Sequence, residues 1–366
     1  MFTNSHMKEP ELTDENARYG PCRLTVELTN VCNLHCGYCL RDEDALYHSP
    51  AQFFPPELLS RVLSGARECM QIEQVMFTGG EVTIHPEFEK IIETVAAHGL
   101  TCSLVTNGWH FERVWPTVLK HRAMVSHVAF SLDGATPEAH DHWRGEGSFK
   151  RVVQALSRCW ANDFPFLLKV GIRRDTIQNL ERIAVFAARM GAASLSFAHL
   201  LPTSNEIANS LTLTLDERAE AEREIALLAR IFKMRVGIDV GYYNTELTSP
   251  CSALSGLSAN IDYRGHLSLC CNLSGFRGGN GEEDVITDLN HVEFGAAFAQ
   301  LQRVAATQAQ RRIKALTDLA TEGARADLTT GSPCLFCLNT MGKTPWDSLV
   351  RITPLTSNAA TVPVLS

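Results

Sequence analysis

Three cysteines near the start of the chain, Cys32, Cys36 and Cys39, lie in the short sequence CNLHCGYC. Thiolates are soft ligands that select iron–sulfur clusters, zinc or copper(I). The CxxxCxxC spacing brings the three thiolates into one loop, where they can bind three irons of a four-iron cube and leave the fourth iron open. An open position of this kind indicates chemistry rather than scaffolding. The alternatives are chance clustering of buried cysteines and a zinc site in which His35 is the fourth ligand.

A second group of cysteines occurs in the last third of the chain. It comprises Cys251, Cys270, Cys271, Cys334 and Cys337, of which the last two form a CxxC pair. Such a pair places two thiolates one tight turn apart, which suits one metal ion or one cluster. The remaining cysteines, Cys22, Cys69, Cys102 and Cys159, fall in or beside predicted core elements and are interpreted as small buried hydrophobes.

The elements that must position the first group alternate between strand and helix. Apolar runs rich in Val, Leu, Phe and Ile are typical of buried parallel strands, and amphipathic stretches between them indicate helices. We expect strands at Arg23–Leu28, Gln74–Phe77, Thr101–Val105, Ser126–Leu132, Phe166–Ile172 and Ala193–His199, and helices at Pro56–Met70, Pro86–His98, Phe111–Lys120, Ser148–Ala161 and Asn179–Met190. Six such units predict an α/β fold, a partial (β/α)6 TIM-like barrel too short to close as an eight-stranded barrel.

Several polar motifs follow these strands directly. The first cysteine loop comes after the first strand, Gly79–Gly80–Glu81 after the second, and Asn107 after the third, while Ser131 and Asp133 lie at the end of the fourth. Parallel α/β folds build their sites at the carboxyl ends of strands. Glu27, at the end of the first strand, is expected either to orient the cysteine loop or to touch substrate.

The pattern changes after residue 202. We expect one amphipathic helix at Thr214–Phe232, a hairpin with Arg264–Gly265 at its turn, a Gly-rich loop at Gly275–Gly281, a helical region at His291–Leu328 and a loosely packed tail after Ile352. The predicted organisation is a tail at 1–20, a barrel core at 21–210, a connecting helix and strand at 211–245, a small cysteine-rich α+β extension at 246–345 and a tail at 346–366.

Composition excludes several other classes of protein. The net charge of −8 and the pI near 5.9 argue against a nucleic-acid partner. The short basic run Arg311, Arg312, Lys314 is interpreted as a solvated helix face. No apolar run approaches the roughly 18 residues of a membrane span, and the polar N-terminus lacks a secretory signal. We therefore expect a cytoplasmic protein without a membrane partner, in which twelve cysteines serve metals rather than disulfides.

Taken together, these motifs resemble those of radical S-adenosylmethionine (SAM) enzymes over roughly residues 20–205. The resemblance rests on the cysteine trio with Tyr38 before its last member, the string TGGEVTIHPEF, VTNG ending at Gly108, SLDG ending at Gly134, and HDHWRGEGSF. It implies the partial barrel already predicted, with a 4Fe–4S cluster on the trio and SAM on its open iron. It also implies roles for further residues: Gly79, Gly80 and Glu81 along the methionine amino group, Tyr38 by the adenine, Ser131 and Asp133 at ribose or carboxylate, Arg144 clamping the carboxylate, and Asn107 as a further contact.

The C-terminal cysteines resemble a shortened form of the auxiliary-cluster region called SPASM, or Twitch. The full seven-cysteine pattern is absent, so the resemblance implies one auxiliary 4Fe–4S cluster on Cys251, Cys270, Cys334 and Cys337, with Cys271 as an alternative to Cys270. Structural zinc on the same thiolates is the other interpretation.

The function implied is reductive cleavage of SAM to a 5′-deoxyadenosyl radical and hydrogen abstraction from a ribosomal peptide or small natural-product precursor, with net oxidation. The expected partners are that substrate and an electron donor such as flavodoxin or ferredoxin. A redox-neutral epimerase, dehydratase or transferase and a non-catalytic protein that binds zinc or a cluster through its cysteines are the alternatives.

Overall fold

The computed structural model describes residues 22–41, 49–204, 207, 210–247, 251–274 and 283–343. The predicted tails, the Gly-rich loop at Gly275–Gly281 and the segment around Glu206 lie outside these ranges. Within the described part, no helix is both long and apolar enough to traverse a bilayer.

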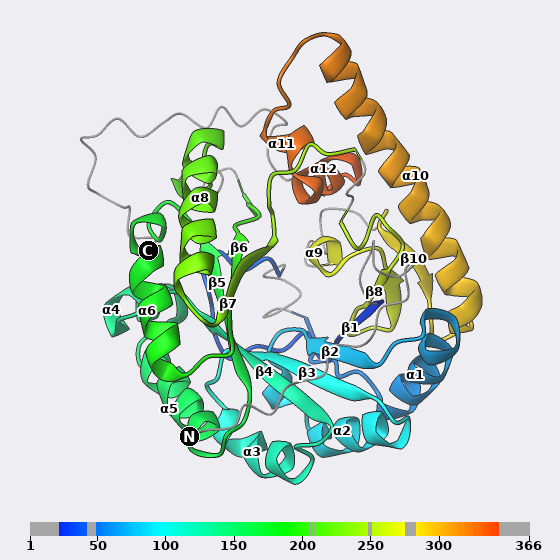
Figure 1. Ribbon diagram of the computed structural model, residues 1–366. Coiled ribbons are helices and arrows are strands. Elements are labelled where there is room, and N and C mark those ends of the chain that lie inside the picture. The colour runs from blue at the N-terminus through cyan, green and yellow to red at the C-terminus, as the bar shows by residue number, and fades with distance from the viewer. Residues whose placement is uncertain are drawn as a thin grey trace.

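One ten-stranded sheet organises the molecule, in the order β10-β9-β8-β1-β2-β3-β4-β5-β6-β7. Strands β1 to β8 run parallel to their neighbours, and β9 and β10 continue the sheet in antiparallel pairing. The sheet curves into an open barrel with helices on its outer side (Figure 1). The described strands are β1 (Arg23–Glu27), β2 (Gln74–Thr78), β3 (Thr101–Thr106), β4 (Val125–Leu132), β5 (Phe166–Ile172), β6 (Ser194–His199), β7 (Arg235–Val240), β8 (Ser258–Ile261), β9 (His266–Ser268) and β10 (Val285–Asp288).

The helices begin and end where the sequence provides caps. Pro56 occupies the first turn of α1, the Thr214 side chain and Glu217 form a capping box at the start of α8, and Gly191 ends α6 in a left-handed conformation with φ of 80°. The described helices are α1 (Pro56–Met70), α2 (Phe88–Ala97), α3 (Phe111–Lys120), α4 (Pro137–Arg144), α5 (Ser148–Ala161), α6 (Leu180–Met190), α8 (Leu215–Ile231), α9 (Cys271–Ser274), α10 (Phe294–Thr321), α11 (Leu328–Gly331) and α12 (Pro333–Thr340), with 3-10 turns at Val82–Ile84 and Ile177–Asn179.

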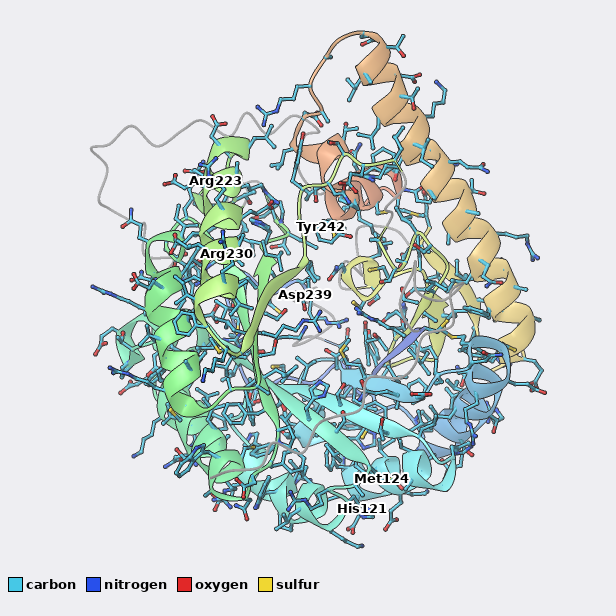
Figure 2. The ribbon with its side chains drawn as sticks, in the orientation of Figure 1. His121, Met124, Arg223, Arg230, Asp239 and Tyr242 are labelled. Atoms are coloured by element: carbon cyan, nitrogen blue, oxygen red, sulfur yellow. The ribbon has the colours of Figure 1, made fainter. Side chains whose placement is uncertain are left out.

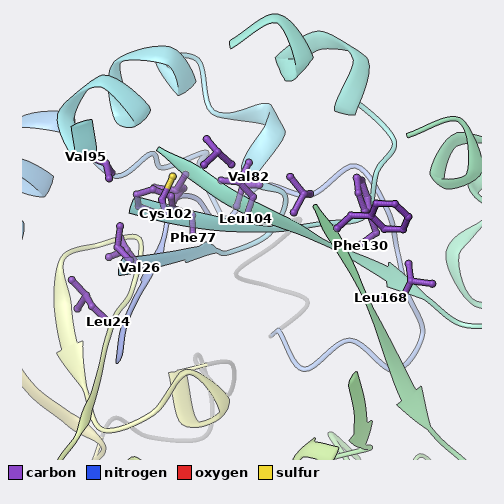
Figure 3. Close-up of a cluster of buried hydrophobic side chains, with 14 of the residues drawn as sticks. Leu24, Val26, Phe77, Val82, Val95, Cys102, Leu104, Phe130 and Leu168 are labelled. Carbon is purple, nitrogen blue, oxygen red and sulfur yellow. The ribbon is translucent and has the colours of Figure 1, made fainter. Parts of the chain in front are cut away.

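The main hydrophobic core lies between the sheet and its outer helices. Alternate strand residues such as Val26, Phe77, Leu104, Phe130 and Leu168 point into this core (Figure 3). The opposite face of the same strands therefore lines the inside of the barrel, because side chains alternate along a strand. Buried polar residues, including Glu27 and Ser103, occupy that inner face.

The partial α/β barrel is confirmed, with three differences from the sequence-based expectation. Strand β7 extends the parallel sheet beyond β6, and β8 pairs in parallel with β1 through the register Leu24 to Ala259, so the C-terminal segment continues the barrel sheet. A helix not predicted from the sequence, α4, spans the HDHWR string and starts at Thr136, whose hydroxyl accepts from the Ala139 N–H. The predicted hairpin is present as β8–β9.

Candidate cofactor and metal site

The first cysteine loop follows β1 and rests on the loop after β2. The Gly80 N–H donates to the Thr29 carbonyl at 2.8 Å, and the Glu81 N–H donates to the Val31 carbonyl at 2.8 Å. A side chain on Gly79 would come within 2.6 Å of the Thr29 oxygen, and one on Gly80 would come within 2.5 Å of the Val31 carbonyl carbon. The two glycines thus allow the two loops to pack backbone against backbone.

Glu81 and Asn107 tie this pair of loops to the end of β3. The buried Glu81 carboxylate accepts from the Thr83 N–H at 3.1 Å, from the Thr106 hydroxyl at 2.6 Å and from the Asn107 N–H at 2.8 Å. The Asn107 amide in turn donates to Asn33 at 3.1 Å and lies 3.9 Å from the Cys32 sulfur. Both residues therefore hold the cysteine loop in place by contacts within the protein.

Tyr38, Asp133 and Arg144 meet on the other side of the cysteine loop. The Tyr38 hydroxyl donates to Asp133 at 2.5 Å, and the Arg144 guanidinium donates to Asp133 and, at 3.0 Å, to the Tyr38 oxygen. These residues come from the loop, the end of β4 and the end of α4. The fold thus brings together three predicted site residues that are up to 106 residues apart in sequence.

A second arginine, which sequence reasoning missed, completes this cluster. Arg173 is fully buried, donates to Asp133 at 2.6 Å, and places its guanidinium 4.5 Å from the Tyr38 ring centre and 4.6 Å from that of Trp143. Trp143 and Arg173 both donate to Asp175, at 2.7 and 3.0 Å. The polar string Arg173 to Asp175 directly after a buried strand could have indicated that Arg173 belongs to the site.

The charges of this cluster determine its protonation. Burial alone would raise the pKa of the Asp133 carboxyl, but the guanidiniums of Arg144 and Arg173 outweigh it and hold that pKa well below its usual range.

Burial raises the pKa of the Cys32 thiol to about 12 and also raises that of Cys36. A bound metal must therefore supply the interaction that makes these thiolates stable.

Ser131 lies apart from these side-chain contacts, half-buried on the inner face of β4 and paired through its backbone with Lys169 of β5. Farther along this face, Lys169 of β5 and Asp239 of β7 form an ion pair at 2.5 Å, each side chain about one-third exposed. Figure 2 shows Asp239 on β7 and Tyr242 on the segment that follows this strand. A side chain at Gly237 would meet nothing within 4 Å, so the space beside this residue of the edge strand β7 is open.

The C-terminal cysteines gather in a second place. Cys251 precedes β8, Cys270 follows β9, Cys271 begins α9, and Cys334 and Cys337 lie one turn apart on α12. Cys251, Cys270, Cys334 and Cys337 pack on one apolar cluster that contains Leu201, Leu254, Leu269 and Leu338. Burial raises the pKa of Cys334 to about 12.

Helix α10 presents two polar side chains to these cysteines. The Gln308 amide lies 3.8 Å from the Cys337 sulfur, and the buried Arg312 guanidinium donates to the carbonyls of Asn244 and Gly331. Burial lowers the pKa of Arg312, and the neighbouring Cys251 and Cys337 oppose this shift. Its interpretation as part of a solvated face was therefore wrong, whereas Arg311 and Lys314 are exposed.

The other cysteines follow the sequence-based expectation only in part. Cys102 and Cys159 are buried and Cys22 is half-buried, but Cys69 is exposed because it lies at the end of α1. Among the described residues, no three cysteine sulfurs lie within 4.8 Å of one another. Four thiolates on one zinc ion, with bonds of 2.3 Å, would be about 3.8 Å apart.

A comparison with protein families identifies the domain that this fold and site form. Residues 26–187 match the family model described as the Radical SAM superfamily. Residues 26–187 are therefore similar to the radical SAM domain, whose members use a 4Fe–4S cluster and SAM as cofactors. The thiol donor set of the first loop fits such a cluster.

Curated relatives also match part of the chain. It is 35% identical over 189 residues to the mycofactocin maturase MftC of Mycobacterium tuberculosis, which covers 50% of this chain and 46% of that protein. It is 26% identical over 231 residues to the PqqA peptide cyclase of Ruegeria pomeroyi, covering 62% of this chain and 58% of that protein. The chain spans about half the length of the curated relatives it matches.

Solved structures share the fold. SuiB of Streptococcus suis bound to S-adenosylmethionine superposes with a TM-score of 0.60 at 12% identity, covering 77% of this chain and 68% of that one. The enzyme anSMEcpe with bound AdoMet gives a TM-score of 0.62 at 17% identity, covering 81% of this chain and 86% of that one. At this identity, the similarity concerns the fold alone.

Proposed function

We propose that the protein is a radical SAM maturase that oxidatively modifies a ribosomal peptide, with a second cluster on its C-terminal cysteines. The observation that carries the proposal is the convergence of the three-cysteine loop with the buried Tyr38–Asp133–Arg144 cluster at the carboxyl ends of the strands. A metal-binding module without catalysis has no need of a charged recognition cluster beside its thiols.

The residues of the first loop hold the cluster and its ligand in place. Cys32, Cys36 and Cys39 bind the 4Fe–4S cluster, and Asn107 supports the Cys32 sulfur from the end of β3. When bound, the reduced cluster supplies one electron to the sulfonium of SAM, which yields the 5′-deoxyadenosyl radical that abstracts hydrogen from substrate. Gly79 and Gly80 set the close approach of the two loops along which the methionine part of SAM binds.

Arg144 is proposed to bind the methionine carboxylate. Its hydrogen bonds to Asp133 and Tyr38 use only part of its N–H groups, so the rest of the guanidinium fork remains for a carboxylate. Asp133 keeps Arg144 oriented, and Arg173 balances the charge of Asp133 from the opposite side. Tyr38 is proposed to contact the adenine, and Ser131 on the inner face of β4 is the candidate for ribose contact.

A cluster on the second cysteine group is supported by the geometry of its thiols. Cys251, Cys270, Cys334 and Cys337 pack on one apolar cluster. Cys271, adjacent to Cys270, stays an alternative ligand. Gln308 and Arg312 of α10 provide an N–H donor and a positive charge beside them, as iron–sulfur clusters commonly have.

The peptide substrate is proposed from the relatives, which include a mycofactocin maturase and the PqqA peptide cyclase. The free space beside Gly237 and the Lys169–Asp239 pair offer a polar inner wall for such a chain. We expect a flavodoxin- or ferredoxin-like protein as electron donor.

Anaerobic reconstitution with iron and sulfide tests the proposal. We expect about eight irons per chain and 5′-deoxyadenosine formation after addition of dithionite and SAM. The variant Cys36→Ala should lose SAM cleavage, whereas Cys69→Ala, which alters an exposed cysteine outside both groups, should retain it.

Synthetic versions of short peptides encoded by neighbouring open reading frames, added one at a time, then test the substrate. A product lighter by two hydrogens supports oxidation. An unchanged product mass with deuterium exchange from solvent indicates a redox-neutral reaction. If no 5′-deoxyadenosine forms, the interpretation as a non-catalytic metal-binding protein holds instead. Four irons with one zinc would contradict the second cluster.

A further inference from the structure

Glu27 is a buried carboxylate that contacts both halves of the molecule. It ends β1 on the inner face of the sheet and is fully buried. One of its oxygens forms an ion pair with Arg41 at 2.7 Å, and the other accepts from the Ser274 hydroxyl and, at 3.4 Å, from the Asn260 amide. Ser274 and Asn260 are 247 and 233 residues away in sequence.

Two of the three partners of Glu27 belong to segments that carry cysteines. Arg41 follows Cys39 by two residues, and Ser274 ends the short helix α9 that Cys271 begins. One carboxylate therefore joins the segment that follows the N-terminal cysteine loop to the helix that Cys271 begins.

We propose that Glu27 and Arg41 are positioning residues that fix the two cysteine sites relative to each other and set the net charge that both experience. The inference rests on the proposed function, because it assumes that each site holds a cluster. A positive charge near an iron–sulfur cluster favours its reduced form, and the Glu27 carboxylate offsets the charge of Arg41. The pair thus links the reduction potentials of the two clusters through one shared counter-charge.

Redox titration of the full reconstituted chain, followed by electron paramagnetic resonance, tests this link. SAM is added to distinguish the first cluster, whose signal it perturbs. In Glu27→Gln the guanidinium loses its counter-charge, so at a fixed potential the ratio of reduced to oxidised form should rise about tenfold at both clusters, which corresponds to 59 mV for one electron. Arg41→Gln should lower the ratio, and the double variant should return it to within about threefold of the native value.

The matched control is Glu112→Gln, which makes the same chemical change at an ion pair on the outer surface of α3. It should leave both potentials unchanged. Potentials that do not move in Glu27→Gln, with both clusters intact by iron analysis, overturn the proposal. A shift confined to the first cluster also overturns it, because Glu27 would then orient only its own loop.

Labelling of the metal-free protein tests the positional half of the proposal independently of cluster loading. Loss of the Glu27–Ser274 contact in Glu27→Ala should speed maleimide modification of Cys271 at least fivefold, while Cys69 keeps its native rate and Glu27→Gln, whose amide oxygen still accepts from Ser274, changes Cys271 less. Equal Cys271 rates in Glu27→Ala and the native protein contradict the link. Four irons in the native chain would instead contradict the auxiliary cluster, and the labelling result would still decide the link.

Discussion

At the scale of single residues, Asp133 is the group on which the first site depends. Its carboxylate is the shared counter-charge of two buried guanidiniums, those of Arg144 and Arg173. Asp133→Asn leaves both without that charge, and breaking a buried pair in this way costs about 3–5 kcal/mol. We expect a corresponding fall in the free energy of unfolding, measured in urea on metal-free protein. Asp163→Asn, at a surface turn, should change it by less than about 0.5 kcal/mol; a similar loss in both variants would contradict this role.

His140 makes the stability of this site depend on pH. It is buried, its Nδ1 accepts from the Asp133 N–H at 3.2 Å, and burial lowers its pKa to about 4. In the unfolded chain its pKa is about 6.5, so between pH 6.5 and 4 only the unfolded state binds the proton. The stabilisation is therefore complete above pH 6.5 and is lost on acidification, by about 3 kcal/mol in total.

Urea unfolding at pH 7 and pH 5 measures this effect. His140→Gln retains an acceptor for the Asp133 N–H but cannot titrate, so its stability should fall less than that of the native protein over this interval. The exposed His291→Gln serves as the control and should follow the native protein. Identical pH profiles for His140→Gln and the native protein would refute the assignment.

Gly80 connects a single residue to cluster binding. A methyl group there would press on the backbone of Val31, which cannot rotate away as a side chain could. We expect Gly80→Ala to lower the stability of the metal-free protein by about 1–3 kcal/mol and to reduce iron retention at the first site. Gly237→Ala adds the same methyl into open space and should bind iron as the native chain does. Full iron loading of Gly80→Ala would show that the loops do not need this close approach.

At the scale of elements, α10 has one face exposed to solvent and another packed against the C-terminal cysteine segment. Arg311 is exposed, whereas its neighbour Arg312 is buried against the C-terminal cysteine segment and donates to two backbone carbonyls. Arg312→Ala should lower stability by about 2–4 kcal/mol, because buried carbonyls lose charged donors, and should lower the iron content toward four. Arg311→Ala is the matched control and should do neither. Urea unfolding measures the stability of the two variants, and iron analysis measures their iron content. Equal values for the two variants would contradict the role of Arg312.

The elements themselves were largely predictable because local signals define them. Apolar runs located the six barrel strands to within one or two residues, and helices α1, α3 and α5 begin and end where their caps and amphipathic patterns predict. Helix α4 was missed because the string HDHWR is polar and contributes few apolar residues to the core. The pairing of β8 with β1 could not be predicted, because the sequence around residue 258 contains no local pattern that indicates pairing with residue 23.

The same distinction applies to the site. Motif residues such as Cys32, Glu81 and Asp133 were identified from sequence because their types and spacing are local features. Arg173 was not, because its role appears only when the fold places it against Asp133, 40 residues earlier. Arg312 was misassigned because its neighbours Arg311 and Lys314 are charged and exposed, so the local sequence does not show that Arg312 lies on the buried face of the helix. Long-range contacts therefore account for most of what sequence reasoning missed.

At the scale of the whole molecule, the continuous sheet predicts that the two cysteine regions unfold together. β8 is bonded on one side to β1 of the barrel and on the other to β9, and Glu27 connects the same two regions through buried contacts. In metal-free protein, tryptophan fluorescence reports mainly on the barrel, where Trp109, Trp115, Trp143 and Trp160 lie, whereas pulsed thiol labelling of Cys334 and Cys337 reports on the C-terminal region. Because opening either region breaks sheet pairing and buried polar contacts of the other, the two urea midpoints should coincide, as a single cooperative transition requires. Labelling of Cys334 and Cys337 at a urea concentration where fluorescence is still native would show instead that the C-terminal region opens as an independent unit.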